Sequence, residues 1–337
     1  MSELFSQYSQ PVLPPGTKIT GKPGNLYKII DDTVNAGGFG RIYRAKLDQI
    51  YKDNTWKIVA LKEFCINPSE FERYKNTFIG TYTMAKIDKN IMWMQSKFRQ
   101  EAILLKRLNE QRDRHVPMIE EEVFRYQDRM FYAMTYIDGP TLTDVVNGHG
   151  PMSEKQAVDY IVQIGKLLYK AHSWEMVHCD ISPNNIMIEN GFAILVDFGN
   201  ARSYNKFWES ITKKQDEDLL SIADNDAEQV GTAGFCPPAQ YIGTKQGDIY
   251  SLAATLYYLL TAEHIIGRLT TQRSKDNAIS KLKSRNVSDE TVSAIMHALD
   301  LKSADSTKDA KTFLWQLPYD IVFNSLLNYN DYDYNKR

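Results

Sequence analysis

The sequence is poor in cysteine and in long apolar runs, and each shortage excludes a class of protein. Its three cysteines, Cys65, Cys179 and Cys236, are far apart and have neither the pattern of a disulfide framework nor the spacing of metal ligands. The longest apolar stretch, residues 251–262, is much shorter than the roughly 20 residues that span a bilayer. No charged segment followed by an apolar run opens the chain. We therefore expect a cytoplasmic protein without a secretion signal or a membrane span.

The sequence also has almost no net charge. Its 40 basic and 42 acidic side chains leave a net charge of −2. A general nucleic-acid binder would carry a basic surplus, so we expect no nucleic-acid partner. Apolar residues make up 43% of the chain, which is typical of a globular protein. Its 337 residues are enough for one large domain or two lobes with a sizeable core.

The distribution of residue types changes along the chain. Residues 1–24 are rich in proline and glycine and are predicted to form an irregular leader. Residues 25–137 are rich in β-forming residues, apart from a polar segment without a clear period at 67–95. Residues 138–318 have mainly helical periodicity, and 319–337 form a tail without a period. The predicted elements of the β-rich region are strands at 26–34, 41–47, 56–64, 121–126 and 130–137 and a helix at 96–108. This order predicts an α+β protein of two lobes.

A hairpin is predicted where Asn190–Gly191 separates two β-forming runs. Folding about this turn sets Glu189 against Phe192, and Asn185 and Asp197 then lie side by side at the open end. Asp180 lies on the loop that leads into the hairpin. These oxygen ligands suit magnesium that carries a polyphosphate. The alternative is a hairpin that merely ends in polar residues.

The β-rich region holds two further signals. Gly37, Gly38 and Gly40 lie between two predicted strands, where backbone without side chains could approach phosphates, although glycine-rich turns are also common without a ligand. Lys62 shares a strand face with apolar residues, and Glu101 borders the apolar stripe of the predicted helix. Because an unpaired buried charge is costly, we predict an ion pair between them. The alternative is that both side chains extend to solvent.

These motifs occur in a fixed order along the chain. A glycine loop at 34–42, "VALK" with Lys62 and the helical Glu101 are followed by "HCDISPNN", "DFG", "GTAGFCPP" and "GDIYSLAATLYYLL". The order resembles the eukaryotic-like (Hanks-type) serine/threonine protein kinases over about residues 26–317. The resemblance implies the two-lobed kinase fold, with a β-rich N-lobe and a mainly helical C-lobe. It also implies ATP and Mg²⁺ as cofactors and a protein with Ser or Thr hydroxyls as substrate.

The resemblance implies a role for each matching residue. Lys62 would hold the α- and β-phosphates while paired with Glu101, and Asp180 would be the catalytic base. Asn185 and Asp197 would bind the metal. Asp248 would support the catalytic loop, unless it is an ordinary helix N-cap. The residues expected around ATP are Val34, Gly37, Gly38, Phe39, Gly40 and Ile42 over the phosphates, Ala60 and Met134 at the adenine, and Tyr136 and Ile137 in the hinge.

The sequence departs from the family pattern at several positions. Ser182 replaces a lysine near the γ-phosphate, and Ala239 replaces the glutamate of a structural ion pair. Two insertions are expected, at 67–95 and 200–229. Cys179 replaces an arginine that would pair with a phosphorylated loop residue, so we expect little dependence of catalysis on loop phosphorylation. The candidate acceptors are Ser210, Thr212 and Ser221.

The groups that are hardest to replace in phosphoryl transfer are all present, so the sequence favours an active kinase. Thr232, in the segment on which protein kinases seat a peptide, favours Ser/Thr substrates. Two alternatives stay open, a small-molecule phosphotransferase of related fold and a pseudokinase scaffold that binds ATP without transferring phosphate. The sequence indicates no oligomeric state.

Overall fold

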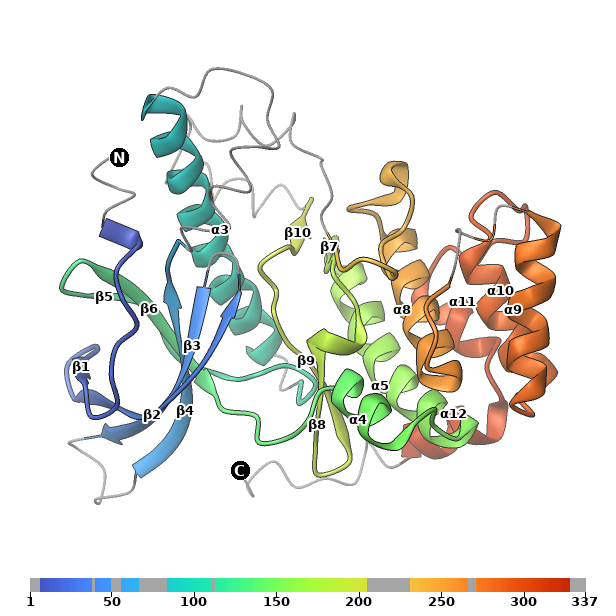
Figure 1. Cartoon of the computed structure of the whole chain (residues 1–337), viewed down its shortest axis with the longest axis horizontal. Coiled ribbons are helices and arrows are strands. Elements are labelled where there is room, and N and C mark those ends of the chain that lie inside the picture. Colours follow the sequence, from blue (N-terminus) through green and yellow to red (C-terminus); the bar gives the residue numbers. More distant parts are fainter. Residues whose placement is uncertain are drawn as a thin grey trace. The chain divides into compact units, whose positions relative to one another are not determined.

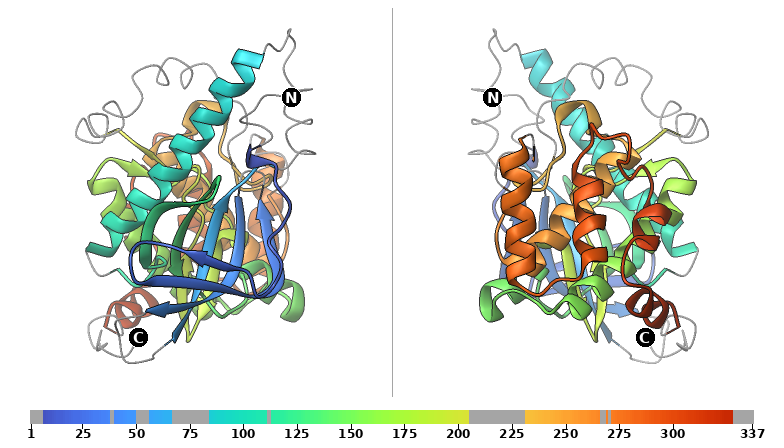
Figure 2. Two further views of the ribbon diagram at one scale, coloured as in Figure 1. Left: turned by 90° about the vertical axis from the view of Figure 1, so that its left-hand side faces the viewer. Right: turned by 90° about the vertical axis from the view of Figure 1, so that its right-hand side faces the viewer.

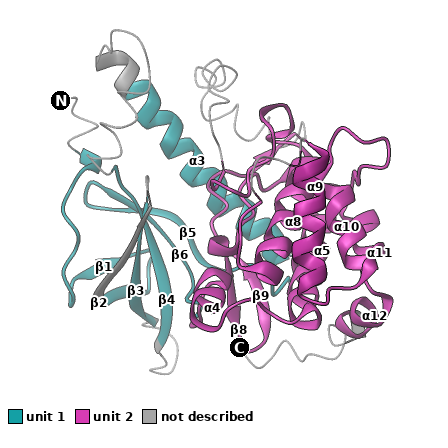
Figure 3. Cartoon of the chain, turned by 45° about the vertical axis from the view of Figure 1, so that its right-hand side comes forward, with its two compact units in different colours: residues 1–137, 212–224 teal, residues 138–211, 225–337 magenta. Residues whose placement is uncertain are grey.

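The chain forms two compact units in a computed structural model that describes residues 7–37, 40–49, 56–66, 84–110, 113–204, 231–265, 269 and 271–327. Unit 1 comprises residues 1–137 and 212–224, and unit 2 comprises residues 138–211 and 225–337 (Figure 3). A β-sheet dominates the described part of unit 1 and helices dominate that of unit 2. The predicted α+β class is therefore confirmed.

Unit 1 contains a six-stranded sheet in the order β1-β2-β3-β4-β6-β5, in which every neighbouring pair is antiparallel. Its strands are β1 Lys18–Thr20, β2 Asn25–Gly37, β3 Gly40–Gln49, β4 Trp56–Phe64, β5 Ile119–Tyr126 and β6 Arg129–Thr135. All five strands predicted from the sequence are present. The prediction of an irregular leader is wrong for β1, because these three residues pair with Leu26–Lys28 of β2.

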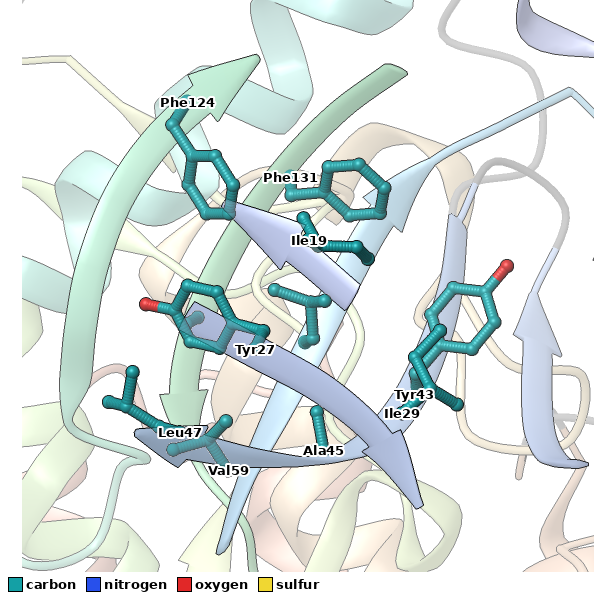
Figure 4. Close-up of a cluster of buried hydrophobic side chains, with 11 residues drawn as sticks. Ile19, Tyr27, Ile29, Tyr43, Ala45, Leu47, Val59, Phe124 and Phe131 are labelled. Atoms are coloured by element: carbon teal, nitrogen blue, oxygen red, sulfur yellow. The ribbon is translucent and has the colours of Figure 1, made fainter. Parts of the chain in front are cut away.

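One face of this sheet holds a hydrophobic core in which the rings of Tyr27, Phe124 and Phe131 stack in sequence (Figure 4). The strands contribute alternate residues to it, as the period of two requires. Its members are Ile19, Tyr27, Ile29, Tyr43, Ala45, Leu47, Val59, Leu61, Phe124, Phe131 and Ala133. Lys62, Phe64 and Tyr132 alternate with members of this cluster and therefore point to the opposite face.

Helix α3, Met84–Glu110, lies along that opposite face of the sheet (Figure 2). Phe98 of α3 contacts the rings of both Phe64 and Tyr132. The helix begins twelve residues before the predicted position 96, so the prediction of an aperiodic segment is wrong for residues 84–95. The buried Ile91 and Met94 extend the stripe of Phe98 at helical spacing, but the apolar residues 92–93 and the polar residues 95–97 between them hide this period in the sequence. Residues 67–83 of the predicted insertion lie outside the described residues.

Unit 2 is built around helix α8, which is buried from Gly247 to Thr261 (Figure 1). Its sequence is apolar on all sides, as expected of a helix surrounded by others. The helices of this unit are α4 Leu142–His149, α5 Glu154–Ser173, α8 Lys245–Thr261, α9 Gln272–Ser284, α10 Asp289–Leu299, α11 Ala310–Trp315 and α12 Tyr319–Leu327. Within the described residues, no helix is both long and apolar enough to cross a membrane.

Two further features complete the described part of unit 2. The first is a series of short elements before α8, namely β7 Met176–Val177, η1 Pro183–Asn185, β8 Ile186–Glu189, β9 Phe192–Leu195, β10 Arg202–Ser203 and η2 Ala239–Tyr241. The second is α12, which packs against α5. The prediction of an aperiodic tail is therefore wrong for residues 319–327, where Val322 N–H donates to the carbonyl of Pro318 and starts the helix.

Candidate active site

Lys62 and Glu101 form a buried ion pair in unit 1. Lys62 lies on β4 and Glu101 on α3, and Lys62 Nζ is 2.7 Å from Glu101 Oε1 and 2.9 Å from Oε2. Lys62 is 9% exposed and Glu101 is 3% exposed, so neither side chain extends into solvent. The predicted ion pair is confirmed. Removal of either partner would leave an uncompensated buried charge.

The residues expected near a nucleotide surround Lys62 in the sheet. Ile42 pairs with Lys62 across β3 and β4, and Ala60 pairs with Met134 across β4 and β6. Gly40 is close to Lys62, because a Cβ at this glycine would be 3.2 Å from Lys62 Cε. A side chain at Gly40 would thus press on the lysine, and this close approach favours glycine. Ala60, Met134 and Ile137 are buried.

The glycine loop is only partly described. Val34 pairs with Tyr43, and Gly37 pairs with Gly40 as the last pair of the β2–β3 hairpin. Gly38 and Phe39 lie outside the described residues. The Tyr136 ring lies under the guanidinium of Arg44, at 5.2 Å. It therefore stays a prediction that the loop contacts phosphate. The hinge role of Tyr136 and Ile137 stays a prediction as well.

The hairpin in unit 2 has the predicted register. Glu189 pairs with Phe192, Ile186 pairs with Leu195, and Val196 N–H donates to the carbonyl of Asn185 at 2.8 Å. Asn190 and Gly191 both have positive φ, 53° and 82°, as a two-residue turn of this type requires. The next residue after Val196 is Asp197, so the hairpin brings Asp197 to the level of Asn185.

Asp180 is held by hydrogen bonds to both carboxylate oxygens. Its Oδ1 accepts from the backbone N–H of Thr232 at 2.8 Å and from the Thr232 hydroxyl at 2.7 Å. Its Oδ2 accepts from Asn200 Nδ2 at 3.2 Å. Sequence reasoning missed the Asn200 contact, although the position of Asn200 directly after the "DFG" motif was the available signal. Together these three donors fix the orientation of the carboxylate.

Asn185 and Asp197 offer oxygen atoms to a hard cation. Asn185 Nδ2 donates to the carbonyl of Asp180 at 2.8 Å, which orients the amide and directs its oxygen away from that carbonyl. Asp197 has a φ of 61°, and its Oδ1 accepts from Gly199 N–H at 3.3 Å. No group of three or more His, Cys, Asp or Glu in the described part of the chain could hold a metal by itself. An amide and one carboxylate fit Mg²⁺, which takes most of its ligands from water and phosphate.

Asp248 of α8 supports the loop that carries Asp180 from within unit 2. Its carboxylate accepts from the N–H of His178 at 2.8 Å and of Cys179 at 2.9 Å, and it lies 2.8 Å from His172 Nε2. The N-cap of α8 is Thr244, whose hydroxyl accepts from Gly247 N–H. The alternative that Asp248 is a helix N-cap is therefore wrong, and the expected supporting contact is present.

His178 is buried beside these carboxylates. Its ring meets that of Phe198 edge-on at 4.6 Å, and its Nδ1 accepts from Asp180 N–H at 3.3 Å. Burial lowers the pKa of His178 below its ordinary value, although the charges of Asp248, Asp180 and Asp197 act in the opposite direction. The imidazole is therefore held neutral, and it links the loop of Asp180 to the "DFG" segment.

Comparison with known proteins connects these contacts to a family. The family model of the protein kinase domain matches residues 31–317. The chain belongs to the protein kinase family. A curated relative of this kinase, the serine/threonine-protein kinase PknA of Nostoc sp., is 26% identical over 243 residues, which cover 71% of this chain and 37% of PknA. The serine/threonine-protein kinase PknB of Mycobacterium tuberculosis is 35% identical over 137 residues, which cover 40% of this chain and 20% of PknB.

The kinase chain thus spans well under half the length of these curated relatives. Comparison with a solved structure gives separate evidence for the fold. The crystal structure of Rad53 residues 1–466 in complex with AMP-PNP matches with a TM-score of 0.56 and 19% identity, over 88% of this chain and 65% of that chain. The two-lobed kinase fold expected from the order of the motifs is therefore confirmed.

The departures from the kinase pattern differ in their surroundings. Ser182 is fully buried, and its hydroxyl has no hydrogen-bond partner among the described residues, so it does not replace a lysine that would reach a phosphate. Ala239 is exposed at the start of η2. Cys179 is buried and adopts a φ of 68°. Ser210, Thr212 and Ser221, with residues 205–229 of the second predicted insertion, lie outside the described residues.

Proposed function

We propose that this chain is an ATP- and Mg²⁺-dependent protein kinase that transfers the γ-phosphate to Ser or Thr hydroxyls of a protein substrate. The observation that supports this best is the pair of hydrogen bonds from Thr232 to Asp180. These bonds connect the candidate base to the "GTAGFCPP" segment, on which the family seats a peptide. A carboxylate held in a fixed orientation is a group that can accept the proton of a substrate alcohol.

The residues of unit 1 would bind the nucleotide. Lys62, held in place by Glu101, would contact the α- and β-phosphates, because a fixed ammonium group stabilises their charge best when it needs no reorganisation. The phosphates would lie under the glycine loop, and the adenine would lie against small and apolar side chains. The residues that we assign are Val34, Gly37, Gly38, Phe39, Gly40 and Ile42 for the loop, Ala60 and Met134 for the adenine, and Tyr136 and Ile137 for the hinge.

The residues of unit 2 would act on the hydroxyl and the metal. Asp180 would accept the proton of the substrate hydroxyl as its oxygen bonds to the γ-phosphorus and ADP leaves. Asn185 and Asp197 would hold Mg²⁺, which when bound neutralises charge on the phosphate oxygens. Asp248 would keep the loop of Asp180 in position through the N–H groups of His178 and Cys179.

A second function, an ATP-binding scaffold without transfer, is favoured by one observation. Ser182 supplies no cation near the γ-phosphate, and its buried hydroxyl does not compensate for this loss. Loss of one cation should slow transfer, whereas the base and both metal ligands are present. We therefore place the active kinase first. The three cysteines, Cys65, Cys179 and Cys236, are thiols, which agrees with the reducing cytoplasm that we propose as its location.

The test is a transfer assay with the purified full chain, labelled ATP and Mg²⁺. The acceptors are a generic basic protein and an acidic one, compared with a panel of sugars and amines. We expect label on Ser and Thr of the proteins and none on the small molecules, and no transfer by Asp180→Asn. Label on a small molecule instead would favour a small-molecule phosphotransferase. ATP binding with no transfer to any acceptor would favour the scaffold.

A further inference from the structure

The segment Gln7–Leu13, here called the N-terminal strap, crosses the end of the unit 1 sheet next to Lys62. On the face of β4 that carries Lys62 and Phe64, the Tyr8 ring meets the Phe64 ring edge-on at 4.9 Å. The carbonyl of Tyr8 accepts from the N–H of Ile66 at 2.8 Å. Tyr8 is only 3% exposed, so its ring is part of the core.

The same strap is fixed on the opposite face of the sheet through Arg129. The Arg129 guanidinium donates to Gln10 Oε1 at 3.1 Å, to the carbonyl of Pro11 at 2.9 Å and to Glu63 Oε1 at 2.8 Å. Glu63 directly follows Lys62 and is 2% exposed. Its second oxygen accepts from the Tyr43 hydroxyl at 2.7 Å, and burial, with Glu63 close by, raises the pKa of Tyr43 to about 12. A buried network of this kind holds only one arrangement of its members.

The strap therefore supports β4 from both faces at Lys62–Phe64. Two contacts join this part of β4 to α3, the ion pair of Lys62 with Glu101 and the ring contact of Phe64 with Phe98 at 5.7 Å. Phe98 and Glu101 are three residues apart on one side of the helix. The Phe64 ring contacts both Tyr8 and Phe98, so it connects the strap to α3.

From these contacts we propose that Tyr8 is a positioning residue for the Lys62–Glu101 ion pair. It acts through Phe64 and Phe98, and removal of its ring allows β4 and α3 to separate. The distance from Lys62 Nζ to the Glu101 carboxylate then increases. This inference rests on the proposed kinase function for its effect on catalysis, but its effect on α3 does not depend on that function.

The variants are Tyr8→Ala and Tyr8→Phe in the full chain. The matched control is Phe124→Ala, because Phe124 is another buried ring of unit 1 and stacks on Tyr27 and Phe131 in the core of the opposite face. Tyr8→Ala and Phe124→Ala should both lower the melting temperature. In hydrogen exchange, only Tyr8→Ala should speed exchange of the α3 amides around Phe98 and Glu101. Tyr8→Phe keeps the ring and should behave like the wild type.

The kinetic arm uses ATP affinity and turnover below the melting temperature. Misplacement of a phosphate-binding group by about an ångström can reduce the rate substantially. We therefore expect Tyr8→Ala to lower kcat/KM for ATP by about tenfold or more. Phe124→Ala should leave kcat/KM for ATP within about twofold of the wild-type value, since Phe124 lies outside the contacts that connect Tyr8 to Lys62. In a Glu101→Gln background, where the ion pair is already broken, Tyr8→Ala should cause little further decrease in kcat/KM for ATP.

Two results would overturn the proposal. One is equal exchange of the α3 amides in Tyr8→Ala and Phe124→Ala, and the other is full additivity of Tyr8→Ala with Glu101→Gln. Failure of the proposed function has a different signature, because the wild type itself would then transfer no phosphate. The exchange comparison needs no catalysis and decides the structural part in that case as well.

Discussion

Asp248 holds Cys179 in a left-handed backbone conformation. The Asp248 carboxylate accepts the Cys179 N–H at 2.9 Å, and Cys179 has a φ of 68°. A residue other than glycine in this region costs about 1–3 kcal/mol unless its surroundings hold it there. The same carboxylate accepts the His178 N–H, so two consecutive peptide groups of the loop before Asp180 are fixed by one side chain of α8.

Asp248→Asn should lower both stability and turnover. The amide has the shape of the carboxylate, but its NH₂ group would face a backbone N–H or His172, and loss of a buried acceptor costs about 1–3 kcal/mol. Denaturant unfolding would measure this loss, and the transfer assay would measure the accompanying fall in kcat. Asp300→Asn is the control, because Asp300 forms a partly exposed ion pair with Lys275, and such pairs contribute about 0–1 kcal/mol. Equal effects of the two substitutions would contradict the role of Asp248.

Asp180→Asn should abolish transfer while it leaves ATP affinity within a few-fold. Asp180 would act on the substrate hydroxyl, whereas the groups proposed to hold the nucleotide lie elsewhere in the chain. Steady-state transfer and direct nucleotide binding would be measured on the same preparation. Asp276→Asn, at an exposed position on α9, should change neither quantity. Retention of most activity in Asp180→Asn would remove its assignment as the base.

Asn200 should affect the turnover without affecting ATP binding. Its amide donates to Asp180 Oδ2 at 3.2 Å, so Asn200→Ala frees one side of the carboxylate and should lower kcat with an unchanged KM for ATP. Asn200→Asp places a second carboxylate beside Asp180, and like charges raise the pKa of one of the two. The acidic limb of the pH–rate profile should then move to higher pH. Identical profiles in wild type and Asn200→Asp would exclude a role for this contact in catalysis.

Asp197→Ala should weaken Mg²⁺-dependent ATP binding, because a proposed direct oxygen ligand of the metal would be lost. Calorimetric titration with ATP at several Mg²⁺ concentrations would show the requirement move to higher metal concentration. Binding of ATP without metal should change little, and this arm separates a metal effect from a folding defect. An unchanged Mg²⁺ requirement together with unchanged activity would remove Asp197 from the proposed site.

Local patterns in the sequence predicted much of this arrangement, and the contacts that were missed join residues that no local pattern marks. The Asn190–Gly191 turn is a short-range signal with one preferred geometry, so the register that brings Asp197 to the level of Asn185 followed from it. The ion pair of Lys62 with Glu101 followed from two charges that each needed a buried partner.

The contacts that were missed are made by residues that no hydrophobic period in the surrounding sequence marks as buried. Tyr8 lies among prolines and polar residues, and its partner Phe64 is far along the chain, so nothing near Tyr8 marked it as a core residue. The bonds from Thr232 to Asp180 join residues 52 positions apart. Helix α3 was predicted too short because the consecutive apolar residues 91–94 and the polar run 95–97 obscure its apolar stripe, although a helix needs only one buried side.

The pH dependence of stability should contain a contribution from His178. Its folded-state pKa lies below its ordinary value because of burial, whereas the unfolded chain protonates this imidazole near pH 6.5. As the pH falls below about 6.5, the unfolded state therefore takes up a proton that the folded state does not. Stability should thus be lost on acidification, by about 1.4 kcal/mol per pH unit for one proton, and only until the folded pKa is reached.

Denaturant unfolding of the wild type and of His178→Asn between pH 7.5 and 5.5 would measure this loss of stability, with His149→Asn, at an exposed position, as control. We expect the slope to fall in His178→Asn alone, and an equal slope in all three proteins would show that folding does not lower the pKa of His178.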